Sequence, residues 1–139
     1  MTLHNQQVGY AGQETAREYL LAENFNIIQE NYRCKLGEID LICSREKELI
    51  FVEVKTDLTG YFGPAEYRVG KKKQRRLKRA ALYFLAQNKP HYRQDWQYRF
   101  DVITVKASLN YDYPPLEERT DKKIIDLQKI EINHYENAF

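Results

Sequence analysis

The sequence lacks the features of several large classes of protein. No stretch approaches the roughly 18–20 continuous apolar residues that a membrane span requires, so no membrane association is expected. The first residues, MTLHNQQVGYAGQ, lack the basic-then-apolar order of a signal peptide, and we therefore expect a cytoplasmic protein. Cys34 and Cys43, the only two cysteines, match no zinc or redox spacing, which favours two reduced thiols.

Internal repeats, low-complexity segments and Gly/Ser-rich linkers are also missing. The 139 residues are 42% hydrophobic and 13% aromatic, which suits one compact domain and makes global disorder improbable. We expect a single domain over residues 1–139, with a core at about 8–105, an exposed excursion at about 106–121 and a C-terminal tail at 122–139.

Charge is unevenly distributed along the chain. The net charge is only +2, but eight basic and no acidic residues lie between Arg68 and Arg79, which leaves a net charge of −6 on the remainder. Like charges four residues apart destabilise a helix, so this cluster favours a nucleic-acid contact over an ordinary solvated face. The candidate contacts are Lys71, Lys72, Lys73, Arg75, Arg76 and Arg79.

Hydrophobic periodicity predicts alternating helices and strands. The expected elements are a helix at about 10–23, a short strand and turn in FNIIQENYR, a hairpin of GEIDLIC and ELIFVEVK, a loop at Gly60–Pro64, an amphipathic helix at about 68–87, a strand at 99–105 and a last strand within 123–133. This order predicts an α/β fold, a mixed β-sheet flanked by helices.

The predicted hairpin brings charged side chains together. Side chains alternate along a strand, so Asp40 faces one way in GEIDLIC, while Glu53 and Lys55 share a face of ELIFVEVK. A turn centred between Glu46 and Lys47 sets Asp40 opposite Glu53. Two such carboxylates suit one Mg²⁺ or Mn²⁺ ion, and Lys55 suits the charge of a phosphoryl transition state. The alternative is a solvent-facing strand with weak surface ion pairs.

The motifs GEIDLI, FVEVK, FG, Val69, Lys73 and RFDV, with the ending HYENAF, resemble in this order the bacterial YraN-like family. The resemblance covers most of residues 9–105 and the tail. It implies the PD-(D/E)XK nuclease superfamily, a restriction-endonuclease-like fold close to Holliday-junction resolvases, and Asp40, Glu53 and Lys55 as the core triad. Resolvases act as dimers, so a homodimer follows by analogy.

Two positions depart from the family pattern. Gln13 stands where the family has a helix-borne acid, and Glu14 is turned about 100° away along a helix. Asp57 replaces an arginine two residues after the motif lysine. Gln13, Glu14 and Glu38 are therefore further candidates for the site, and both departures weaken the catalytic case more than the fold case.

Three functions remain open. The first is a Mg²⁺- or Mn²⁺-dependent endonuclease acting on DNA, including branched DNA. The second is a nucleic-acid-binding protein that keeps the fold without turnover, and the third is a protein-interaction module. Asp101 and the tail residues Asn133, His134 and Phe139 are expected to have structural roles.

Overall fold

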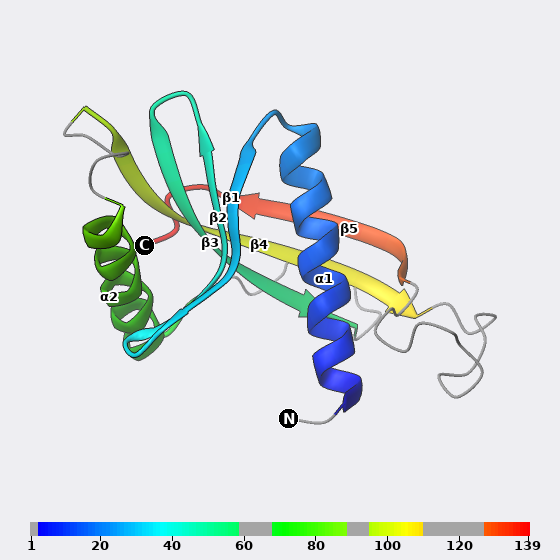
Figure 1. The fold of residues 1–139 in the computed structure, drawn as a ribbon. Coiled ribbons are helices and arrows are strands. Elements are labelled where there is room, and N and C mark those ends of the chain that lie inside the picture. Colours follow the sequence, from blue (N-terminus) through cyan, green and yellow to red (C-terminus); the bar gives the residue numbers. More distant parts are fainter. Residues whose placement is uncertain (1–2, 59–67, 89–94, 110–126) are drawn as a thin grey trace.

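The computed structural model describes residues 3–58, 68–88, 95–109 and 127–139. Within these residues, five strands form a single sheet, and one of two helices packs against each of its faces (Figure 1). In chain order they are α1 (Leu3–Ala22), β1 (Asn26–Cys34), β2 (Gly37–Arg45), β3 (Glu48–Asp57), α2 (Lys71–Gln87), β4 (Gln97–Leu109) and β5 (Leu127–Tyr135). Neither described helix is long and apolar enough to cross a bilayer.

The sheet is mixed, with the strands side by side in chain order from β1 to β5. All neighbours are antiparallel except β3 and β4, which are parallel. Parallel neighbours need a long crossover connection, and α2 lies within it. The fold is therefore α/β with a five-stranded mixed sheet and two helices, which agrees with the restriction-endonuclease-like architecture expected from the sequence.

Successive residues of β3 pack against opposite helices. Ile50 and Val52 belong to the apolar cluster that includes Ala16 and Leu20 of α1. Phe51 belongs to the cluster that includes Phe84 and other buried residues of α2. The sheet is consequently covered on both faces, and its central strands are apolar on both sides.

Helix α1 begins seven residues before the predicted start, because its first turns carry no apolar stripe and include two glycines. Gly12 has a specific role there. A Cβ atom at this position would lie 1.8 Å from Oγ1 of Thr56, so the absence of a side chain lets α1 approach β3 closely. The helix ends at Ala22, and Asn24 follows in the left-handed conformation with φ 67°, which agrees with the predicted stop.

The C-terminal boundaries require one correction. Residues 106–109 were assigned to an exposed excursion, but they continue β4, where Lys106 pairs with Asp57 of β3 and Glu131 of β5. Lys106 and Ala107 are buried there, and a lysine in the sequence gave no sign of that burial. The last strand is confirmed as β5. Residues 110–126 and the predicted loop at Gly60–Pro64 lie outside the described residues.

Candidate metal and nucleic-acid site

The predicted hairpin register is confirmed up to a fork between β2 and β3. Pairs from Arg45–Glu48 to Leu41–Val52 follow the expected alignment. The pairing ends there, one residue before Asp40 and Glu53, and the first half of β2 continues alongside β1 alone. The fork thus opens at the position where the sequence placed the two carboxylates.

A bend in both strands produces the fork. Asn31, on β1 beside Asp40, has the left-handed conformation with φ 51°, which asparagine tolerates better than most residues. Beyond this bend, Ile39 joins the α2-side cluster, whereas Leu41 stays in the α1-side cluster. Ile39 and Leu41, two residues apart on β2, therefore do not share a face as strand alternation would predict, because alternation does not survive the bend.

Asp40 is fixed within the fork. Its Oδ2 accepts a hydrogen bond of 2.8 Å from the backbone N–H of Val54, a donor of β3 beyond the last β2–β3 pair. Burial and the negative charge of Glu53 raise the pKa of Asp40 to about 6, against the opposing effect of the Val54 hydrogen bond. The two carboxylates are close enough to repel each other, although they are not a cross-strand pair.

Glu53 is nearly buried and its charge is balanced by α2. Its side chain is 8% exposed, and its Oε1 lies 2.5 Å from Nζ of Lys73. Burial lowers the pKa of Lys73, but the contacts with Glu53 and Asp40 outweigh burial and raise it. Lys73, predicted as a nucleic-acid contact, is thus the ion-pair partner of a predicted metal ligand.

Lys55 lies on the expected face of β3, but its ammonium group contacts the backbone before α2 and neither carboxylate. It shares the α2-facing side of β3 with Glu53, as predicted by alternation. Its Nζ donates a short hydrogen bond to the carbonyl oxygen of Arg68, just before α2. Within the described residues it forms no ion pair with Asp40 or Glu53, so the structure places the lysine near the pair without direct contact.

Gln13 is brought to the fork by the close approach of α1 at Gly12. It is only 9% exposed, and it lines a cleft of about 900 Å³ together with Asp40, Glu38 and Thr56. We call this space the α1 cleft. Glu14 is not among its described lining residues, in keeping with the 100° offset along the helix. Gln13 rather than Glu14 therefore faces the cleft that Asp40 also lines.

A second opening of about 910 Å³ lies between the end of the β1–β2 hairpin and the start of α2. We call it the α2 groove. Five basic residues line it, opposed by Glu38: Arg33, Lys35, Lys72, Lys73 and Arg76. The hairpin end rests closely on α2, because a Cβ atom at Gly37 would lie 3.1 Å from the carbonyl oxygen of Arg76.

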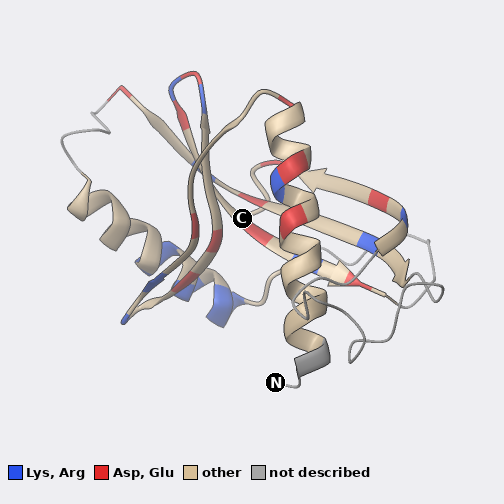
Figure 2. Ribbon diagram, turned by 45° about the vertical axis from the view of Figure 1, so that its right-hand side comes forward, with Lys and Arg blue, Asp and Glu red and all other residues tan. Residues whose placement is uncertain are grey.

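The six predicted nucleic-acid contacts on α2 divide into two groups. Lys72, Lys73 and Arg76 line the α2 groove, whereas Lys71, Arg75 and Arg79 are not among its described lining residues. In Figure 2 the basic positions of α2 lie next to the hairpin end, and acidic positions of the strands lie beside them. Arg33 and Lys35 were not predicted, since a turn between two strands gave no sign that it would lie over α2.

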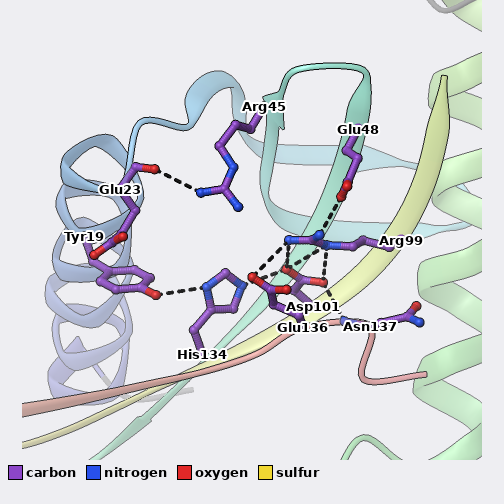
Figure 3. Close-up of polar contacts among 9 residues, drawn as sticks. All are labelled: Tyr19, Glu23, Arg45, Glu48, Arg99, Asp101, His134, Glu136 and Asn137. Carbon is purple, nitrogen blue, oxygen red and sulfur yellow. Dashed lines mark hydrogen bonds and ion pairs between the residues drawn. The ribbon is translucent and has the colours of Figure 1, made fainter.

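Asp101 belongs to a separate network on the α1-facing side of the sheet, where His134 reaches Tyr19 (Figure 3). It is fully buried and contacts His134 at 2.7 Å, the N–H of Asn137 at 2.9 Å and Arg99 at 3.1 Å. His134 Nδ1 in turn lies 3.0 Å from the hydroxyl of Tyr19 on α1. The network joins the tail to β4 and α1, which matches the structural role expected for Asp101 and His134.

The fold and the position of the fork define an α/β protein with restriction-endonuclease-like architecture and a carboxylate pair at the sheet. The chain belongs to the uncharacterised protein family UPF0102, whose model matches residues 12–105. This confirms the resemblance to the YraN-like family.

Relatives named "UPF0102 protein" cover most of the chain. One from Geobacter metallireducens is 40% identical over 108 residues, which is 78% of this chain and 86% of the relative. One from Alkaliphilus oremlandii is 36% identical over 135 residues, 97% of this chain and 99% of the relative. One from Geotalea daltonii is 43% identical over 101 residues, 73% of this chain and 77% of the relative. Their names identify the family and no activity.

Proposed function

We propose that this protein is a nucleic-acid phosphodiesterase that uses a divalent cation, Mg²⁺ or Mn²⁺, with DNA as the first candidate substrate. The observation that carries the proposal is the repelling carboxylate pair at the fork, where the pKa of Asp40 rises to about 6. Mutual repulsion of buried carboxylates costs stability, and a cation bound between them would relieve it. Perturbed pKa values of this kind cluster at functional sites.

The donor set fits such a cation. Asp40 and Glu53 offer carboxylate oxygens, and Gln13 offers an amide oxygen in the adjoining α1 cleft. No group of three His, Cys, Asp or Glu suited to a metal exists among the residues that the structure describes. Mg²⁺ accepts one or two protein carboxylates and keeps several waters, so a sparse site is sufficient. A bound cation would polarise a phosphoryl oxygen and lower the pKa of water at the site.

The protein groups around the fork have distinct expected roles. The Val54 N–H holds the Asp40 carboxylate in one orientation, which preorganises it. Lys73 neutralises Glu53 until a substrate phosphate is present, and Lys55 on the same strand face would stabilise negative charge in the transition state. The Gln13 amide would orient a water, with less effect on its acidity than a carboxylate has.

The α2 groove supplies the surface for the nucleic-acid backbone. It adjoins the α1 cleft, since Arg33 and Glu38 line both spaces. Its five basic side chains suit consecutive phosphates, and its position at the N-terminus of α2 adds backbone N–H groups that favour anions. A nucleic-acid strand bound in the groove would pass close to Glu53, because Lys73 lines the groove and forms an ion pair with Glu53.

A binding protein without turnover is the second candidate. Two observations favour it: Lys73 already compensates the charge of Glu53, and Gln13 gives the α1 cleft an amide in place of an acid. Both features lower the negative charge available to hold a cation. Turnover, rather than binding, therefore separates the two candidates.

The test is cleavage of linear and branched DNA by the pure protein with Mg²⁺, with Mn²⁺ and with EDTA. We expect cleavage only with a divalent cation, and a loss of at least about 100-fold in Asp40→Asn and Lys55→Ala, the scale of a lost transition-state contact. Asp95→Asn is the matched control, because Asp95 is an exposed acid paired with Lys47 away from the fork. Binding without metal-dependent cleavage by the wild type would instead establish the second candidate.

A further inference from the structure

The two spaces that meet at the fork differ sharply in charge. The α2 groove has five basic residues and one acid among its described lining residues. The α1 cleft has two acids, Glu38 and Asp40, and one base, Arg33, whose Nε lies 3.7 Å from Glu38. Away from the proposed cation at Asp40, the α1 cleft attracts a phosphate backbone far less than the α2 groove does, so the rest of the cleft is available to another part of the substrate.

The other side chains of the α1 cleft are mostly neutral hydrogen-bonding groups. Asn5, Gln6, Gln13 and Asn31 contribute amides, each of which carries both donors and acceptors, as the edge of a nucleobase does. Tyr10 lines the same cleft from α1 and is 47% exposed, so its ring is available for stacking. The volume of about 900 Å³ leaves room for a nucleobase. These properties match a nucleobase and not a phosphate.

We propose that the α1 cleft binds one unpaired nucleobase, turned out of the stack beside the phosphate at the fork. This inference rests on the proposed function and names its substrate class: nucleic acid with an unpaired nucleotide at the cut, such as a bulge, a junction or a single strand. A paired base inside a duplex has its edge and faces covered, so it cannot enter the cleft without unpairing. The phosphates on one side of that nucleotide lie along the α2 groove.

Binding to two short DNA duplexes in EDTA tests the inference without turnover. One duplex carries a single unpaired 2-aminopurine, and the other is the same duplex fully paired. Wild-type protein should bind the first about tenfold more tightly, the effect of one base–aromatic stack. It should also quench the 2-aminopurine fluorescence. Tyr10→Ala should lose both effects, and Tyr10→Trp should keep them. Tyr83→Ala is the control, since Tyr83 is 45% exposed on α2 and comparable to Tyr10 in exposure.

Equal affinity of the wild type for the two duplexes, or a preference that Tyr10→Ala retains, would overturn the inference. The proposed hydrolysis is tested by cleavage, and its outcome is independent of the binding result. A protein that prefers the unpaired base but cuts nothing with Mg²⁺ or Mn²⁺ supports the cleft assignment and refutes hydrolysis. A protein that cuts DNA and binds both duplexes equally supports hydrolysis and refutes the cleft assignment.

Discussion

Asp40 is half-buried and Asp101 is fully buried, and their surroundings act on the two carboxyl groups in opposite ways. Burial raises the pKa of Asp101, but its contacts with His134, the Asn137 N–H and Arg99 outweigh burial and lower it. The ionised form of Asp101 therefore stabilises the fold above its ordinary pKa, and this stability is lost as pH falls through its lowered folded-state value. For Asp40 the raised pKa has the opposite sign: ionisation costs stability as pH rises from 3.8 to about 6.

Asp40→Asn should therefore stabilise the metal-free protein at pH 7.5. The amide oxygen can still accept from the Val54 N–H, while the repulsion with Glu53 disappears. We expect a gain of about 1–2 kcal/mol in the free energy of unfolding, or about 2–8 °C in Tm, measured by thermal denaturation in EDTA.

The gain should shrink as pH falls from about 6 to about 4 and vanish below that, where Asp40 is protonated in both the folded and the unfolded wild type. Asp95→Asn, which removes an exposed acid whose pKa the contact with Lys47 lowers, should give no such gain. An Asp40→Asn variant less stable than wild type at pH 7.5 would show that the fork carboxylates do not repel each other.

At the scale of elements, α1 is the part of the site least visible in the sequence. Its first turns have glycines and amides in place of an apolar stripe, so periodicity placed the start of the helix too late. The close approach at Gly12 brings Gln13 to the cleft that Asp40 lines, and nothing local in the sequence signals the proximity of Gly12 to Thr56 on β3. The hairpin register, in contrast, followed from turn position and alternation as far as the bend at Asn31.

Two helix glycines should respond oppositely to alanine. Gly12→Ala should lower the free energy of unfolding by about 1–3 kcal/mol, since its Cβ would overlap Thr56. Gly9→Ala should raise it by about 0.5–1 kcal/mol, since no atom lies within 4 Å of the added Cβ and alanine favours helix. Urea denaturation of both variants measures the difference, and equal effects would argue against the close approach of α1 to β3.

The two groups of basic residues on α2 should differ in DNA binding. Lys72→Ala and Arg76→Ala remove residues of the α2 groove, whereas Lys71→Ala and Arg79→Ala remove the same types of side chain outside it. Each change in the groove should weaken binding at low salt and reduce the slope of log K against log salt by about 0.7–0.9. Fluorescence anisotropy over a salt series measures both quantities. Equal losses from all four variants would mean that the helix binds through its general charge.

At the scale of the whole molecule, the sequence predicted the fold class, the hairpin and the last strand, because these depend on alternation and apolar periodicity. The α2 groove could not be predicted in full. Its α2 residues stood out as a charge cluster, but Arg33 and Lys35 join them only because β1 and β2 bend toward α2. The ion pair between Lys73 and Glu53 likewise depends on how α2 lies across the sheet.

The most direct test of the central claim is Mn²⁺ binding followed by electron paramagnetic resonance of the full chain. We expect wild-type protein to bind Mn²⁺ at the fork and Mg²⁺ to displace it. Asp40→Asn and Glu53→Gln should each weaken this binding by at least about tenfold, as expected for the loss of one of two carboxylate ligands. Asp95→Asn should bind as wild type does, because Asp95 pairs with Lys47 at the surface. Unchanged Mn²⁺ affinity in both fork variants would contradict the assignment of a metal site to Asp40 and Glu53.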